Sequence, residues 1–218
     1  MLNCGMGTLF AIVIGVLIIV KHSAVAEFVS ILGPEMETVY LIVAGVLCMI
    51  GSMNDTAVPS VSLEGKSLWL LQSLPVEPWR VLRAKLRMQL LLTAPPMLFC
   101  CVCAAAVLKP SPIFAVLLIV FPLIYSLFSA CFGLMIGVLK PNLNWTNEIT
   151  PIKQSLSVML VLFSGWIFAG VVIGLYFLIG KFIGAAAYLS AVLLLTAVAS
   201  VLIISWLKRS GSRIFSAL

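Results

Sequence analysis

Long, uninterrupted apolar stretches constrain this chain more than any other feature of its sequence. Six of them occur, and each is near the roughly 20 residues that a helix needs to cross a bilayer. They cover Cys4–Val20, Glu37–Ser52, Met88–Leu108, Ile113–Leu139, Ser157–Ile179 and Phe182–Leu207. Because lipid offers the backbone no hydrogen-bond partners, such segments must be helices or strands of a closed barrel. The apolar residues do not alternate with polar ones, which favours helices.

The composition agrees with a membrane protein. Of the 218 residues, 63% are hydrophobic and 9% are charged, whereas a soluble domain carries about 25% charged residues. The net charge is +6, but no Lys/Arg run interleaved with aromatic residues indicates a nucleic-acid partner. We therefore predict one all-α integral membrane domain over residues 1–218. The first apolar run lacks the basic start of a signal peptide and is expected to remain as a span.

Basic residues predict the orientation of the chain. Six spans put both termini on one side of the membrane, together with segments 53–87 and 140–155. Ten basic residues lie on this side: Lys66, Arg80, Arg83, Lys85, Arg87, Lys140, Lys153, Lys208, Arg209 and Arg213. The other side has three: Lys21, Lys109 and Lys181. Because cytoplasmic loops carry the excess of Lys and Arg, both termini are expected in the cytoplasm.

Gly65-Lys66-Ser67 matches the end of a phosphate-binding loop, G-x-x-x-x-G-K-[ST]. However, Ser60 stands at the position of the first glycine, and no buried strand precedes it. A soluble nucleotide-binding domain of about 100 residues would also not fit between the spans. We therefore expect no nucleotide and no other cofactor on this chain.

The same segment has the pattern of an amphipathic helix lying in the membrane interface. A helix can start at Pro59-Ser60, and Pro75 ends it. Its apolar face is formed by Leu63, Leu68, Trp69, Leu70, Leu71 and Leu74. A second helix can begin at Pro78 and continue into the third span. From the residues alone two interpretations stay open: a membrane anchor with arginines reaching the headgroups, or a docking element for a cytoplasmic protein.

The sequence contains no clear catalytic or metal-binding pattern. Cys100 and Cys103 form a C-x-x-C, but a zinc site needs four ligands and the only histidine, His22, lies in another segment. No Asp, Glu, Lys or Arg lies deep within the six runs, which argues against an ion-coupled transporter and an intramembrane enzyme. We expect neither a metal nor enzymatic activity.

Glycine spacing and proline positions predict how the spans pack. Gly133 with Gly137, and Gly170 with Gly174, form G-x-x-x-G patterns, which allow helix backbones to approach closely. Pro95-Pro96 in the third span and Pro122 in the fourth predict kinks.

Three segments resemble a known family. "SVSLEGKSLWLLQSLPV" followed by "RVLRAKL", then "KPNLNWTNEITPIKQS", and the closing "SWLKRSGSRIFSAL" resemble permease subunits of bacterial ATP-binding-cassette (ABC) exporters of the type-2 class. The similarity covers nearly the whole chain and is to the C-terminal half of these permeases. The chain is then a half-unit that dimerises, a subunit paired with another membrane half, or a truncated remnant.

The resemblance implies an ATP-driven exporter in the bacterial cytoplasmic (plasma) membrane. Permeases of this class carry a coupling helix between spans 2 and 3, which docks on a separate subunit that binds ATP and Mg²⁺. Expected ATPase-docking residues are Glu64, Gly65, Lys66, Trp69 and Arg80. The second cytoplasmic loop would contribute Asn144, Trp145, Asn147, Glu148 and Lys153.

A mostly apolar pathway would suit a lipid, a peptide or an amphipathic drug-like substrate. Two alternatives remain: a non-transporting membrane scaffold or assembly protein that holds a partner with the same loop, and an ion-coupled secondary transporter.

Overall fold

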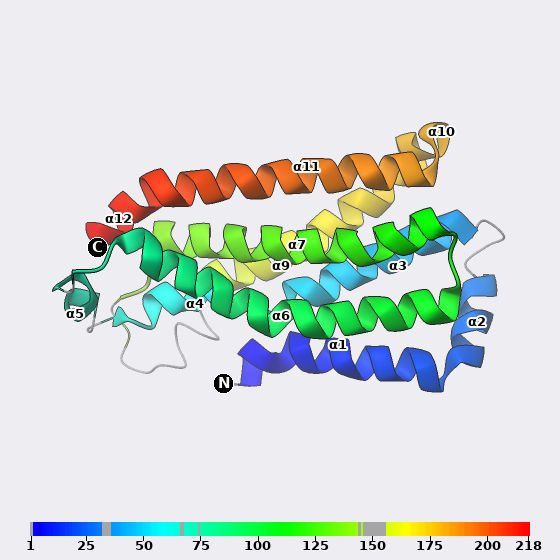
Figure 1. Ribbon diagram of the computed structural model, residues 1–218, viewed down its shortest axis with the longest axis horizontal. Helices are drawn as coiled ribbons and strands as arrows, with labels where there is room; N and C mark the ends of the chain where they lie inside the picture. Colours follow the sequence, from blue (N-terminus) through cyan, green and yellow to red (C-terminus); the bar gives the residue numbers. More distant parts are fainter. Residues whose placement is uncertain (1, 32–35, 66–67, 74, 144, 146–155) are drawn as a thin grey trace.

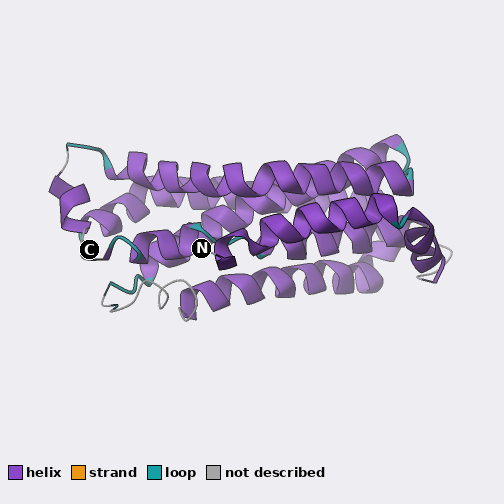
Figure 2. Ribbon diagram, turned by 90° about the horizontal axis from the view of Figure 1, so that it is seen from below, coloured by secondary structure: helices purple, strands orange, loops and turns teal. Residues whose placement is uncertain are grey.

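The computed structural model is built from helices packed side by side (Figures 1 and 2). It describes residues 2–31, 36–65, 68–73, 75–143, 145 and 156–218, and no strand occurs among them. Successive long helices run in opposite directions along the longest axis (Figure 1). The prediction of an all-α chain is therefore confirmed.

Long and short helices alternate along the chain. The long helices are α1 (Leu2–Val20), α3 (Met36–Ser52), α6 (Pro78–Leu108), α7 (Pro112–Leu139), α9 (Leu156–Leu175) and α11 (Ala185–Trp206). The short ones are α2 (His22–Ile31), α4 (Ala57–Ser62), α5 (Leu68–Ser73), α10 (Lys181–Ile183) and α12 (Ser212–Ser216). Two π-helical turns, η2 (Tyr176–Gly180) and η3 (Leu207–Gly211), extend α9 and α11.

Five helical stretches in the described residues are long and apolar enough to cross a membrane. They are Met36–Ser62, Pro78–Leu108, Pro112–Leu139, Leu156–Ile183 and Ala185–Ser216. The apolar stretch of α1, Gly5–Val20, is shorter. By the length and composition of its helices the chain is a multi-pass membrane protein, and the sixth span predicted at Cys4–Val20 stays a prediction.

The third span is part of a longer helix than its apolar run suggests. α6 begins at Pro78, a favoured first position of a helix, and continues without a break to Leu108. Pro95 and Pro96 lie within it, and Figure 1 shows that α6 changes direction along its course. Loss of a backbone hydrogen bond at an internal proline gives this effect.

α7 is the central helix, in contact with α3, α4, α6, α9 and α11. Phe121, Tyr125 and Leu134 on α7 are all buried, and the ring of Tyr125 stacks on Phe168 of α9 with the ring centroids 4.9 Å apart. The hydrophobic core therefore surrounds α7 on several sides.

The amphipathic helix predicted from Pro59 to Leu74 is divided into two in the structure. α4 ends at Ser62, α5 begins at Leu68, and Gly65 between them has a φ of +37°, where a side chain is disfavoured. α4 is also not an interfacial helix, because nearly all of it is buried inside the bundle: Ala57, Val58, Pro59, Val61 and Ser62.

Two glycines of α7 admit α4 to the bundle. A Cβ placed on Gly137 would lie 2.6 Å from the Val58 carbonyl oxygen, and one on Gly133 would lie 2.9 Å from Val58 Cγ2. Real side chains do not make contacts this short, so the backbones of α4 and α7 approach closely only because these positions are glycine.

Replacing Gly137 by alanine should destabilise the protein, while the same change at Gly170 should not. The Gly137→Ala methyl group would clash with backbone, and forced contacts of this kind cost about 1–3 kcal/mol. A Cβ on Gly170 meets nothing within 4 Å, so Gly170→Ala is the matched control. Thermal unfolding in detergent should show Gly137→Ala melting several degrees below the control, and equal unfolding temperatures would contradict this account.

Candidate functional site

The polar segments of the chain meet at the end of the bundle that holds α4, α5 and α12 (Figure 1), which we call the polar end. The first polar segment begins at Met53, directly after α3, and the second begins at Lys140, directly after α7. Both had been predicted from the sequence as separate cytoplasmic loops. The contacts between them define the candidate site.

A hydrogen bond from Trp145 joins the two segments. Its Nε1 donates to the Ser62 carbonyl oxygen at 2.7 Å, and the backbone N–H of Asn142 donates to Ser62 Oγ at 3.0 Å. A Cβ on Gly65 would lie 2.8 Å from Trp145 Nε1. Gly65 is therefore required twice, by its positive φ and by the indole that lies against it.

Lys85 connects this junction to α6. Its Nζ donates to the Ser60 carbonyl oxygen at 2.8 Å and to Glu64 Oε1 at 2.5 Å. The Lys85 and Glu64 side chains are only 12% and 17% exposed. A partly buried, charge-assisted contact of this kind is stronger than a surface ion pair. The end of α4 is therefore tied to a long membrane helix by charge.

The structure describes only some of the other residues that were predicted to dock an ATPase. Arg80 is exposed on the first turn of α6, where its Nε lies 3.6 Å from Glu77 Oε2. Trp69 belongs to α5, but its side chain lies outside the described part of the structure. Also outside the described residues are Lys66, Asn144, Asn147, Glu148 and Lys153.

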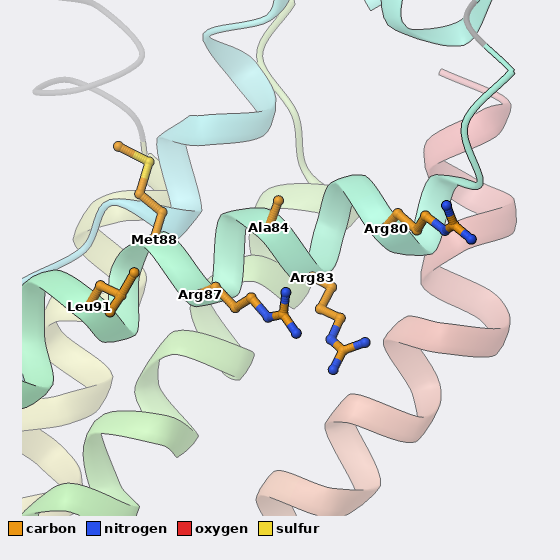
Figure 3. A pocket seen from close by; sticks show the side chains of 6 residues that line it. All are labelled: Arg80, Arg83, Ala84, Arg87, Met88 and Leu91. Atoms are coloured by element: carbon orange, nitrogen blue, oxygen red, sulfur yellow. The ribbon is translucent and has the colours of Figure 1, made fainter.

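Two unpaired arginines follow Arg80 along α6. Figure 3 shows Arg83 and Arg87 extending on the same side of the helix, and they line a shallow pocket with Met88 and Leu91. Neither arginine forms an ion pair within the described residues. Guanidinium groups followed along a helix by exposed apolar side chains match the change from headgroup to hydrocarbon in a bilayer.

A buried polar network lies deeper in the bundle, at the corner between α3 and α4. Asn54 Nδ2 donates to Thr8 Oγ1 at 2.9 Å, and Asn54 Oδ1 accepts from the Thr8 backbone N–H at 3.0 Å. Gln89 of α6 donates through Nε2 to the Asn54 carbonyl oxygen at 2.9 Å and accepts from the Ala57 N–H at 2.6 Å. These bonds join α1, α6 and the start of α4.

Sequence reasoning missed this corner. Residues 53–56 were assigned to a cytoplasmic segment, whereas Asn54 and its neighbour Asp55 are 2% and 7% exposed. The only signal in the sequence was Gln89, a polar residue just inside the third apolar run. An ionisable residue outside the six apolar runs is therefore buried within the helix bundle, although its segment was expected to lie in the cytoplasm.

The remaining predicted features are not gathered into a site. Within the described residues, no group of three or more His, Cys, Asp or Glu side chains could hold a metal ion. A Cβ added to Gly170 or Gly174 would have no neighbour within 4 Å in the described structure. Five cysteines are buried and free: Cys48, Cys100, Cys101, Cys103 and Cys131.

Comparison with known proteins finds no family model, no curated protein and no solved structure that matches the chain. The function must therefore be argued from the residues and their arrangement.

Replacing Trp145 by phenylalanine should loosen α4 without unfolding the bundle. The change keeps a ring beside Gly65 but leaves the Ser62 carbonyl oxygen without its donor, which costs about 1–3 kcal/mol. Hydrogen exchange of the backbone amides in residues 57–65 should become about tenfold faster or more.

Trp166→Phe is the control, because Trp166 is exposed and makes no hydrogen bond in the described structure. Exchange over residues 57–65 that stays at the wild-type rate in Trp145→Phe would show that Trp145 does not hold the junction together.

Proposed function

We propose that this chain is a transmembrane permease subunit of an ATP-driven ABC exporter, and that its polar end docks a separate ATPase. The substrate would be a lipid, a peptide or an amphipathic drug-like molecule. ATP and Mg²⁺ would bind to the partner, so the chain itself would not be an enzyme. The membrane would be the bacterial cytoplasmic membrane.

The observation that carries this proposal is the contact of Lys85 with Ser60 and Glu64. A docking element transmits force only if it is attached to the helices that must move. Lys85 attaches the segment after α4 to α6, and α6 continues to the opposite end of the bundle at Leu108. A push on the polar end would therefore tilt or rotate a membrane helix, which is the rigid-body movement that alternating access requires.

The exposed face of the polar end is suited to binding a partner. Leu70 of α5 and Val76 before α6 are 52% and 44% exposed, and the charged Glu77 and Arg80 follow them. A surface of exposed apolar groups next to arginine is typical of protein interfaces.

A second membrane half would complete the pathway. In the apolar 18-residue stretch of the Leu156–Ile183 helix, only 22% is buried inside the bundle. In the corresponding stretch of Ala185–Ser216, only 17% is buried. These two helices supply the faces available to lipid and to a homodimeric or paired half-permease. A non-transporting scaffold, the first alternative, predicts partner binding without ATP-dependent export. An ion-coupled transporter, the second, predicts export without ATP.

Reporter fusions test the proposed topology of six spans with both ends inside. If α1 crosses the membrane, green fluorescent protein fused to either terminus should fluoresce, and alkaline phosphatase at either terminus should be inactive. If only five helices cross, the two termini lie on opposite sides, and the N-terminal fusions alone would give the reverse result.

Charge reversal of Arg80 tests the docking surface. We expect Arg80→Glu to lower the amount of co-purifying ABC ATPase, and the rise in ATP hydrolysis on reconstitution, by about tenfold, as for an interface arginine worth 1.4 kcal/mol. The Glu77 contact is exposed and contributes only about 0–1 kcal/mol, so the fold should survive.

Lys181→Glu, at an exposed site in α10 at the opposite end of the bundle, is the matched control and should leave both readouts unchanged. If the wild-type chain neither retains an ABC ATPase nor raises its hydrolysis rate, the proposed function is wrong for this chain.

A further inference from the structure

Asp55 is a buried acid whose carboxyl group makes no hydrogen bond within the described structure. It is the only aspartate of the chain, it lies between α3 and α4, and it is 7% exposed. Neither of its carboxyl oxygens has a hydrogen-bond partner among the described residues. The Gln89 amide lies near Asp55. However, Gln89 Nε2 donates its hydrogen bond of normal length, 2.9 Å, to the Asn54 carbonyl oxygen.

The surroundings of Asp55 are close-packed and come from several helices. On the α7 side, Asp55 Oδ1 lies 3.1 Å from the position of a Cβ on Gly133. Tyr125 of α7 is near enough to interact electrostatically with Asp55. On the α9 side, the Tyr125 hydroxyl and Ser52 Oγ each lie 2.6 Å from a Cβ position on Gly165.

Among the residues that the structure describes, no cationic side chain neutralises Asp55. In the described structure, the titratable side chains on the α3 and α7 sides of Asp55 are Tyr125 of α7 and Cys48 of α3, which interacts with Tyr125. Neither side chain can carry a positive charge. On α6, Lys85 lies one turn before Gln89 but contacts Glu64 and Ser60 instead. Arg87, which is nearer to Gln89 along the helix, is exposed and lines the surface pocket with Arg83. α4 and the facing α9 residues Val161 and Gly165 carry no ionisable group.

An ionised carboxylate in this position would be strongly unfavourable. Burial of an unpaired charge in an apolar interior costs so much that the group takes up a proton or a counter-ion instead. Within the described residues no cluster of three metal-binding side chains exists. The smallest neutralising ligand, a proton, fits a packed corner without displacing any side chain.

We propose that Asp55 is a proton-binding site inside the membrane domain, and that the bound proton keeps the α3–α4 corner seated against α7. Ionisation of the carboxyl group places an unpaired charge beside Gly133 and loosens this contact. α4 links the corner directly to the junction at Ser62 and Glu64, so occupancy of the proton site sets how firmly the polar end is held. The inference concerns protonation alone and does not depend on the ATPase partner.

Because Asp55 is the only aspartate, isotope labelling can isolate it without a mutation. Cell-free synthesis with aspartate carrying ¹³C in the side-chain carboxyl labels this one group. In nanodiscs at about pH 7, the infrared spectrum should contain a protonated carboxyl C=O band that moves when ¹³C replaces ¹²C and disappears at alkaline pH. Absence of an isotope-sensitive band at neutral pH would overturn the proposal.

Asp55→Asn mimics the protonated carboxyl and supplies an independent test. Because Asp55 holds its proton in the folded protein and releases it on unfolding, the unfolding temperature of the wild type should fall by about 3 °C or more between about pH 6 and pH 9. In Asp55→Asn this pH-dependent fall should be lost, while Glu77→Gln, at an exposed acid, should keep it.

A fall of equal size in Asp55→Asn would overturn the proposal. Stabilisation of the wild type by sodium chloride but not by choline chloride, abolished in Asp55→Asn, would also overturn it, because the ligand would then be a metal cation. The infrared measurement uses the wild-type sequence and decides the question even if the variant does not fold.

Discussion

The close approach of α4 to α7 is the contact on which the rest of the polar end depends. A helix of six residues has too little surface to hold itself in a bundle unless its backbone comes close to a neighbour. Gly137 removes the side chain that would strike the Val58 carbonyl oxygen, and Gly133, one turn earlier, removes the one that would strike the Val58 side chain. Once α4 is seated there, Asp55 at its start and Ser62 at its end have fixed positions.

The acidic residues at the two ends of α4 have different electrostatic surroundings. After its last residue, Glu64 has a lysine from α6 at contact distance, and partial burial strengthens this charge-assisted contact. Before its first residue, Asp55 has no cationic partner in the described part of the chain. A single short helix thus separates a paired carboxylate from an unpaired one. Movement of α4 would change the surroundings of both.

The local parts of this fold follow from the sequence, and the long-range parts do not. Uninterrupted apolar runs predict membrane helices because each run forms its own backbone hydrogen bonds, and Pro78 correctly marks the start of α6. The burial of Asn54 and Asp55 depends on Gly133 and Gly137 of α7, which lie about 80 positions later. Likewise, Trp145 meets Ser62 across 83 positions. Nothing in "MNDTAVP" alone distinguishes such a buried corner from an exposed loop.

The basic and apolar side chains of α6 are separated along the length of the helix as well as around its circumference. Arg83 and Arg87 are exposed near its start, Lys109 caps its end, and the residues between are mainly apolar. Sliding by one helical turn would carry a cation about 5.4 Å toward the hydrocarbon, and an arginine at the centre of a bilayer costs about 2.5–3.5 kcal/mol even on the milder scales. The helix is therefore held at a fixed depth by cations at both ends. Piston-like travel across the membrane is disfavoured, and rocking about the middle of the helix, near Pro95 and Pro96, is the low-cost movement left to it.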